Sequence, residues 1–195
     1  MYLANIEENR YLMEMCPAVV SGVPTLYMDN VLKVMEDGSS TWPTRIVDAY
    51  GGRAEAGSPI EMTMSYDEDA VTVDVAVDVL DPMTAESYHL VVAVTEDDIY
   101  APGSNGEEYH NQVFRRLFPG QNGIPVSTEP GEQIYTIDLD LDPEWAADNL
   151  RATAWVQADT TGAILNSATM MLTTGTTDVA GDDRVVEAVA ELDGA

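Results

Sequence analysis

Five valines separated by single residues constrain the fold of this chain more than any other feature. They are Val71, Val73, Val75, Val77 and Val79, and Thr, Asp, Ala and Asp lie between them. Side chains of a β-strand point to opposite faces in turn, so this pattern predicts a strand with one buried and one solvated face. Residues 60–66 alternate in the same way, and the acidic residues 67–69 between the two segments predict a turn. The two segments should therefore form an antiparallel hairpin.

Further strands are expected at the spacing that is typical of a β-sandwich. They fall at residues 89–95, 111–118, 134–141, 150–158 and 163–172, with turn residues between them. The segment 89–95 is apolar on both faces, which favours a central strand. Together these segments predict a mainly β fold in which two antiparallel sheets face each other.

A small α+β segment is expected before the strands. Residues 2–16 have a loose helical pattern that Pro17 ends, and residues 19–35 read as a hairpin around the turn pair Asp29-Asn30. A second helix should begin near Trp42-Pro43 and end at Gly51-Gly52, with residues 53–58 as a linker. The acidic tail, residues 174–195, is expected to be frayed or to form a short helix over 184–192.

The charge balance excludes several classes of partner. The chain has 35 Asp and Glu residues against 8 Lys and Arg residues, which gives a net charge of −27. Nucleic acids need cations on their partner, and an anionic membrane surface would repel this chain. No apolar run is long enough for direct membrane insertion. The acid excess has two readings that stay open: dispersal of an acidic, secreted protein, or adaptation to high salt, in which self-repulsion is screened.

Three stretches of the sequence resemble one bacterial family. They include Val20-Ser-Gly-Val-Pro-Thr-Leu-Tyr-Met-Asp29, Tyr109-His-Asn-Gln-Val-Phe-Arg-Arg116 and Ala154-Trp-Val-Gln-Ala-Asp-Thr-Thr-Gly-Ala-Ile-Leu165. In this order they resemble the secreted proteins related to the twenty-eight-kilodalton outer-membrane protein. The resemblance implies a thioredoxin-like domain joined to an immunoglobulin-like β-sandwich. Residues 57–173 would form the sandwich, and residues 1–53 resemble only the C-terminal part of a thioredoxin fold.

The redox chemistry of a thioredoxin is not carried over with this resemblance. Val23-Pro24-Thr25 matches the cis-proline strand of that fold, so Pro24 is expected to be cis. Cys16 is the only cysteine, and Pro-Ala-Val follows it, so the Cys-x-x-Cys motif is absent. We expect either the C-terminal part of a longer protein or a chain that has lost the catalytic half.

One acidic loop is the best candidate for a metal site. Its candidate Ca²⁺ ligands are Glu96, Asp97, Asp98, Glu107 and Glu108, because calcium prefers several hard oxygen ligands. The alternative is a solvated crossover whose polar side chains cap turns. Asp138, Asp140 and Asp142 also repeat at every second residue, and there the solvent face of a strand is favoured. No other cofactor is expected.

The remaining polar residues favour structural roles. His89 and His110 lack an accompanying nucleophile motif, so hydrogen bonding within the fold is expected of them. Arg115 and Arg116 should pair with Glu96 or Asp97 and order the acidic loop. An aromatic sugar platform is not established, although Trp42, Tyr100 and Tyr109 can contribute to one. No catalytic residue is assigned, and the chain is not expected to be an enzyme.

Three functions follow from these features. The preferred one is a non-catalytic, extracytoplasmic binding or assembly module, a surface or fibre component that self-associates through exposed strand edges. The second is the C-terminal part of a thioredoxin-like redox protein, and the third is a calcium- or carbohydrate-binding module. A protein partner or a second copy is expected. The expected place is secreted, periplasmic or on the cell surface, although residues 1–8 do not read as a signal peptide.

Overall fold

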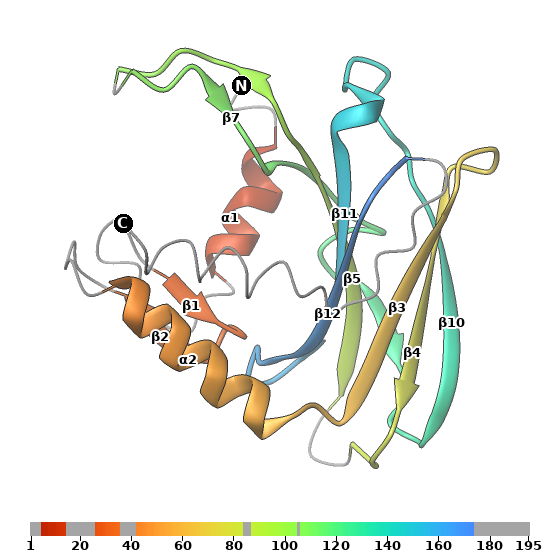
Figure 1. Cartoon of the computed structure of the whole chain (residues 1–195). Coiled ribbons are helices and arrows are strands. Elements are labelled where there is room, and N and C mark those ends of the chain that lie inside the picture. Colours follow the sequence, from red (N-terminus) through yellow and green to blue (C-terminus); the bar gives the residue numbers. More distant parts are fainter. Residues whose placement is uncertain (1–4, 15–25, 36–41, 84–86, 105, 174–195) are drawn as a thin grey trace.

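Two antiparallel β-sheets facing each other form the body of the computed structural model, which describes residues 5–14, 26–35, 42–83, 87–104 and 106–173 (Figure 1). The first sheet has the strand order β10 (Gly131–Asp138), β4 (Thr72–Val79) and β3 (Ile60–Asp67). The second has the order β12 (Ile164–Met171), β11 (Leu150–Ala158), β5 (Tyr88–Glu96) and β8 (Val113–Phe118), and β9 (Ile124–Val126) pairs with the start of β5. The predicted mainly β, sandwich-like architecture is confirmed.

The alternating valines lie at the centre of the core between the sheets. Val73, Val75, Val77 and Val79 of β4 are at most 1% exposed. They share one buried cluster with alternate residues of the opposite sheet, which are Leu90, Val92, Val94, Ala152, Ala154 and Val156. A slip of one residue would move the whole row of valines to solvent, so burial fixes the register of β4. Val71 lies in the turn before β4 and not in the strand, with a left-handed φ of 54°.

The second sheet is covered on both faces, as the apolar segment 89–95 predicted. Val91 and Ala93 of β5 point away from the sandwich core and pack with Trp155, Tyr11 and Leu12. The two last residues belong to helix α1 (Ile6–Glu14), which lies against the outer face of this sheet. α1 therefore adds a third layer over β5 and β8.

The hairpin predicted around Asp29-Asn30 is present and docks on the sandwich. Its strands are β1 (Leu26–Met28) and β2 (Leu32–Met35), and both turn residues have left-handed backbone, with φ of 49° and 57°. Positive φ at both central residues is the geometry of a type I′ β-turn, which the Val31 N–H closes by donating to the Met28 carbonyl over 3.1 Å. The Ile164 N–H donates to the Asp29 carbonyl over 3.0 Å, and the Asn30 side-chain amide donates to the Gly162 carbonyl over 2.9 Å. The turn of the hairpin thus contacts the β11–β12 turn.

The end of the second helix was predicted wrongly. Helix α2 (Trp42–Ala56) packs against β2 and continues through Gly51-Gly52 into the expected linker. Two glycines inside a helix cost about 1 kcal/mol each relative to alanine, which an ion pair between Arg53 of α2 and Asp29 helps to offset. The helix ends at Ala56, and the φ of 69° at Gly57 suits the left-handed position after a helix C-terminus.

Some predictions fall on residues outside the described ranges. They are the cis peptide at Pro24, the surroundings of Cys16 and the tail helix over 184–192. The likeness of residues 1–53 to part of a thioredoxin stays a prediction. Among the described residues, the cis peptide bond joins Phe118 and Pro119, and no helix there is long and apolar enough to span a membrane.

The outer face of the three-stranded sheet carries a row of like charges. Asp78 of β4 lies directly opposite Glu61 of β3 on one side and Glu132 of β10 on the other. Carboxylates directly opposite each other on neighbouring strands destabilise a sheet. The register that buries the valines therefore imposes a repulsion on the solvent face.

Replacing the middle carboxylate of this row should stabilise the protein most at low salt. We expect Asp78→Asn to raise the free energy of unfolding by about 0.2–1 kcal/mol at 20 mM KCl, because it removes two opposed pairs. The gain should shrink in 1 M KCl, where the Debye length is about 3 Å. Thermal denaturation followed by circular dichroism measures both values. Glu144→Gln, an exposed charge outside the sheets, is the control, and an equal or salt-independent gain there would contradict the repulsion.

Candidate functional site

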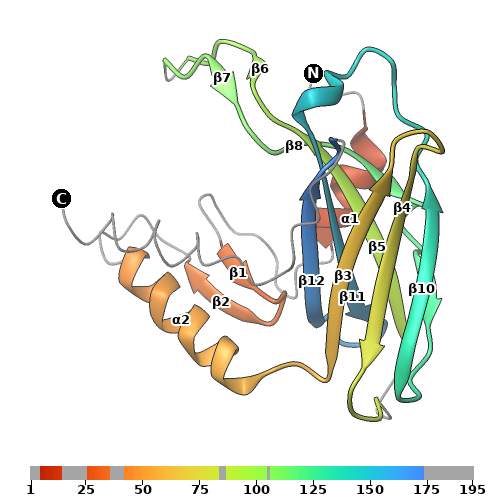
Figure 2. The ribbon, with the colours of Figure 1, turned by 45° about the vertical axis from the view of Figure 1, so that its right-hand side comes forward.

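A hairpin between β5 and β8 extends beyond the sandwich, and we call its residues 97–104 and 106–112 the arm (Figure 2). Its strands, β6 (Ile99–Tyr100) and β7 (Tyr109–His110), pair antiparallel. Two backbone hydrogen bonds of 2.8 Å continue the ladder, from Ala101 N–H to the Glu108 carbonyl and from Gly103 N–H to the Glu107 carbonyl. Figures 1 and 2 both show the arm leaving the end of the sandwich, so it projects from the body.

Two tyrosines lie opposite each other on the arm. The ring centroids of Tyr100 and Tyr109 are 5.3 Å apart, and the ring planes are tilted by 57°. The two residues are 58% and 55% exposed. A cross-strand aromatic pair stabilises a short hairpin. The His110 ring adds a 2.7 Å hydrogen bond between its Nε2 and the Ala101 carbonyl, which is the structural role expected of this histidine.

A buried ion pair fixes the base of the arm. The Glu96 carboxylate, only 8% exposed, accepts hydrogen bonds from Arg115 over 2.7 Å and from the Ala146 N–H over 3.0 Å. The Arg115 guanidinium also lies 5.8 Å from the centre of the Trp145 ring. The pair expected between Arg115 and Glu96 is therefore present, and it joins β5, β8 and the loop before β11.

Two other charged residues at the base of the arm, Asp97 and Arg116, have different partners. Asp97 accepts a 2.6 Å hydrogen bond from the Gln112 N–H and lies 3.9 Å from Arg151. Arg116 binds the exposed Asp140 over 3.0 Å, so its expected pairing with Glu96 or Asp97 was wrong. The physical reason is a β-bulge: Val94 pairs with Arg116 and Thr95 with Phe114, so Arg115 is the extra residue of β8. A bulge changes the direction of a side chain, and the two arginines therefore meet different carboxylates.

The five candidate calcium ligands do not share one environment. Glu96 is neutralised by Arg115 and Asp97 faces the arm base, whereas Asp98, Glu107 and Glu108 are exposed. Within the described part of the chain, no group of three or more His, Cys, Asp or Glu residues is placed to hold a metal ion. Calcium binding by this loop stays a prediction without geometric support.

The aspartates after β10 behave as a solvated row. The exposed Asp138 and Asp140 alternate with the buried Ile137 and Leu139, and Asp142 caps a turn by accepting a 2.9 Å hydrogen bond from the Glu144 N–H. This arrangement matches the solvent-facing alternative favoured for these residues.

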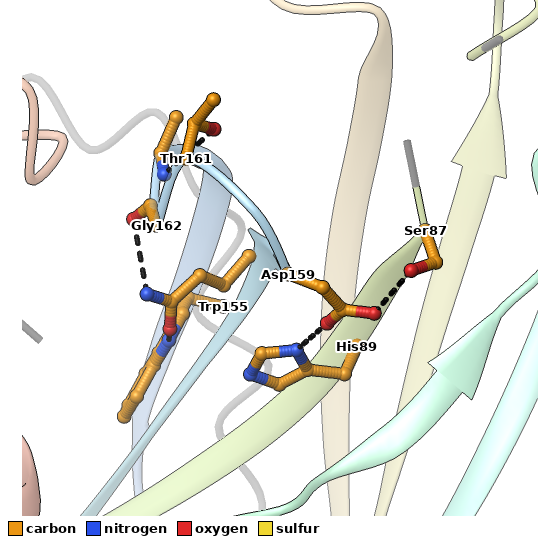
Figure 3. A network of polar contacts seen from close by, with 8 residues as sticks. Ser87, His89, Trp155, Asp159, Thr161 and Gly162 are labelled. Atoms are coloured by element: carbon orange, nitrogen blue, oxygen red, sulfur yellow. Dashed lines mark hydrogen bonds and ion pairs between the residues drawn. The ribbon is translucent and has the colours of Figure 1, made fainter. Parts of the chain in front are cut away.

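A second polar network joins the opposite end of β5 to the β11–β12 turn (Figure 3). The Ser87 hydroxyl donates to one oxygen of Asp159, and His89 Nδ1 pairs with the other oxygen. The hydrogen bonds from Ser87 and His89 favour the charged carboxylate and lower the pKa of Asp159. His89 Nε2 is buried with no hydrogen-bond partner. Sequence reasoning missed this network, although Asp159 begins the recognisable turn segment Asp-Thr-Thr-Gly.

Serine, histidine and aspartate also form the catalytic triads of hydrolases, but here the hydrogen bonds connect them in a different order. In a catalytic triad the serine hydroxyl is bonded to histidine, which removes its proton. Here the Ser87 hydroxyl donates a hydrogen bond to the carboxylate of Asp159, and His89 Nδ1 is bonded to the same carboxylate. The arrangement ties a turn to a strand, and the Ser87 hydroxyl is bonded to the Asp159 carboxylate and not to a histidine.

The β11–β12 turn also connects to the segments before the sandwich. The Gln157 side-chain amide donates to the Gly162 carbonyl over 3.0 Å, which is the carbonyl that also accepts from Asn30. Burial, and secondarily the charge of Asp159, raises the pKa of Tyr11 on α1. The turn therefore contacts the β1–β2 hairpin and β5, and the charge of its Asp159 also acts on Tyr11 of α1.

The two adjacent arginines allow a matched test of the arm base. Arg115→Met should lower the free energy of unfolding by about 3 kcal/mol, because it leaves Glu96 buried without its counter-charge. Arg116→Met should cost at most about 1 kcal/mol, because its partner Asp140 is exposed. Urea denaturation measures both. Equal losses would contradict a special role for the buried pair, and adding Glu96→Gln to Arg115→Met should recover part of the loss.

The Asp159 network should make stability depend on pH in the acid range. Because the folded pKa of Asp159 lies below its unfolded value, its contribution is complete above about pH 5 and is lost as the pH falls through the folded pKa. The difference in unfolding free energy between the parent chain and Asp159→Asn should therefore shrink below about pH 4. Urea denaturation from pH 3 to 7 measures it. Ser87→Ala should reduce this pH dependence, and an unchanged profile would contradict the assignment.

A comparison with one solved structure supports the fold. The structure is similar to HBP35 of Porphyromonas gingivalis, with a TM-score of 0.67 at 14% sequence identity, over 89% of this chain and 61% of that chain. This chain thus spans less than two thirds of that protein, and the likeness concerns the fold alone. A domain of the outer membrane lipoprotein Omp28 from Porphyromonas gingivalis matches with a TM-score of 0.37 and 16% identity, over 59% of this chain and 88% of that chain. A comparison with curated proteins gives no match.

The family is established by the sequence itself. The sequence model of the family described as "Outer membrane protein Omp28" matches residues 18–174, which include the β1–β2 hairpin, α2, both sheets and the arm. This match covers most of the chain and confirms the resemblance found in the three sequence stretches. The chain therefore belongs to the Omp28 family of outer membrane proteins.

Proposed function

We propose that this chain is a non-catalytic binding module located outside the cytoplasm, and that it contacts another protein through the arm. The family takes its description from an outer membrane protein, and this supports a place in the cell envelope for the present chain. The observation that carries the proposal is the tyrosine pair on a projecting hairpin. More than half of the surface of Tyr100 and of Tyr109 is exposed. Tyrosine is among the residues most enriched at the energetic centres of protein interfaces, so an exposed pair of this kind suits a binding surface.

The base of the arm supports this role. A binding surface gains affinity when it is ordered before its partner arrives. The Glu96–Arg115 pair, the Asp97–Gln112 hydrogen bond and the backbone ladder hold the arm without a ligand. These contacts support an arm that presents its tyrosines in a fixed geometry.

The polar networks support a module without catalytic chemistry. The Ser87 hydroxyl donates its hydrogen bond to the Asp159 carboxylate and not to a histidine, so this hydroxyl is not prepared as a nucleophile. Cys16 lacks a second cysteine, so a redox role requires residues of a longer protein. The thioredoxin-like alternative therefore concerns such a longer protein, and this chain alone should have no dithiol activity.

Self-association through a strand edge is a second candidate, and one observation favours it. β10 is an edge strand, and Ile134 on its outer face is 64% exposed. Glu132 and Asp138 lie on the same strand, and a second copy would carry the same carboxylates within its own net charge of −27. Like charges of this kind oppose edge pairing between identical chains. The arm is therefore the preferred contact.

A photo-crosslinking experiment in intact host cells distinguishes the two surfaces. The crosslinking residue p-benzoylphenylalanine is placed at position 100 in the arm, at position 134 on β10, or at position 50 on α2, where Tyr50 is 50% exposed. We expect a discrete adduct of higher mass from position 100 only. An adduct from position 134 alone would favour the strand edge, and no adduct from position 100 would overturn the arm as the binding surface.

A further inference from the structure

We infer that the outer edge of β8 is a pairing surface for the same edge of a second copy of the chain, and that helix α1 keeps this surface closed. The edge of β8 is separate from the arm and its tyrosines, which carry the proposed function. Three features of the molecule support this role: the protection of the other sheet edges, the hydrogen bonds between α1 and β8, and the charge along β8.

The strand orders of the two sheets end in β3 and β10, and in β12 and β8. β3 and β12 contact each other, and the Asn166 side-chain amide of β12 donates to the Ile60 carbonyl of β3 over 2.9 Å. β10 carries the carboxylates Glu132 and Asp138, and charged side chains are one means by which proteins protect a sheet edge. β8 pairs with β5 on one side, and none of the described strands pairs with its outer side. The outer edge of β8 therefore needs another form of protection.

Two side chains of α1 bond the backbone groups of this edge. The Asn5 side-chain amide, at the start of α1, donates to the Arg115 carbonyl over 3.0 Å. The Leu117 N–H donates to the Glu8 carboxylate over 2.8 Å. An edge strand offers its outward N–H and C=O groups to any further strand, and here α1 has bonded one group of each kind. Asn5 and Glu8 thus take the place of a neighbouring strand.

The two side chains are held by each other and by the apolar side of their helix. Asn5 Nδ2 also donates to the Glu8 carboxylate over 2.6 Å. Tyr11 and Leu12, about one turn further along α1, pack in one cluster with the buried Leu117. α1 has only nine residues, and isolated helices shorter than about 12–15 residues are marginal in water. Its contacts with the second sheet therefore keep α1 in place, and their loss should release it from β8.

The strand β8 lacks the carboxylates that protect β10. Residues 113–118 include two arginines and neither Asp nor Glu. Arg115 binds the buried Glu96 and Arg116 binds Asp140, so both positive charges are neutralised within the chain. Like charges directly opposite each other destabilise paired strands, and this repulsion is smallest where the charges are neutralised. Without α1, β8 is therefore the edge at which two copies meet with the least local repulsion.

A second copy is the occupant that suits this edge. Two β8 strands can pair antiparallel about a two-fold axis, and this joins the second sheets of both copies into one. Such a contact is closed, because each copy uses the same edge and offers no further one to a third chain. The product expected from an open β8 edge is therefore a dimer.

The test compares full-chain variants by sedimentation equilibrium in 1 M KCl, where a Debye length of about 3 Å screens the repulsion between two chains of net charge −27. Asn5→Ala combined with Glu8→Ala removes both side chains that bond the edge. We expect this double variant to form dimers whose fraction rises with protein concentration, whereas the parent chain remains monomeric. A double variant that stays monomeric would overturn the inference, as would an equal fraction of dimers in the parent.

Glu8→Gln separates the hydrogen bond from the charge. It removes the same negative charge as Glu8→Ala but keeps a side-chain oxygen that can accept from the Leu117 N–H. Glu8→Gln should therefore remain monomeric, and so should Glu7→Ala, which removes an exposed carboxylate of the same helix. If either of these variants dimerised as much as the double variant, the effect would come from charge alone and α1 would not be a cover of the edge.

Hydrogen exchange at the Leu117 amide, followed by NMR, locates the pairing. At low concentration of the double variant this amide should exchange at least about tenfold faster than in the parent, because it has lost its acceptor. The exchange should slow again as dimers form, since a second strand then supplies a carbonyl. Dimers without this renewed protection would place the association at another surface and would contradict the inference. The circular dichroism spectrum of each variant, unchanged from the parent, is the control for folding.

Discussion

The packing of one row of valines against strands β5 and β11 is the constraint on which the rest of the structure depends. It fixes the register of β4 and, through it, the pairing of β3 and β10 on either side. It also buries the inner face of β5, while α1 covers the outer face of that strand. β5 then places a polar network at each end: His89 near its beginning and Glu96 at its end. A strand held on both faces is a rigid support, so both networks are built on the most firmly held element of the fold.

The parts of the fold that were predictable are those in which burial follows a simple period. The alternation in residues 60–79 and the apolar run in 89–95 each depend on the solvent exposure of single strands, which a sequence records directly. The errors arose where a long-range contact decided the outcome. Gly51-Gly52 reads as a helix stop, yet the helix continues and Arg53 then meets Asp29. β6, β7 and β9 have two or three residues each, too few for a period, and their pairing partners define them.

The candidate site likewise has one part that the sequence predicts and other parts that depend on the pairing of distant strands. A pair between Arg115 and Glu96 was predictable because few cations are present and the arginine follows the acidic loop. The Asp159 network was not, because Asp159 and His89 are 70 residues apart and meet only through the pairing of β5 with β11. Tyr100 and Tyr109 are visible in the sequence as exposed aromatic residues of a loop. Their direct opposition depends on the register of β6 and β7, which no periodic pattern in so short a hairpin can specify.

The acidic composition affects both the stability of the chain and the charge of its surfaces. Arg53, Arg115, Arg116 and Arg151 each lie beside a carboxylate of another element, so these cations hold the structure together and are not displayed on a binding surface. The carboxylates that remain have two effects. On the outer face of β3, β4 and β10 they oppose one another and discourage edge pairing with a second copy. On the arm, where Asp98 and Glu108 are exposed on the same hairpin as Tyr100 and Tyr109, they give the surface beside the rings a negative charge.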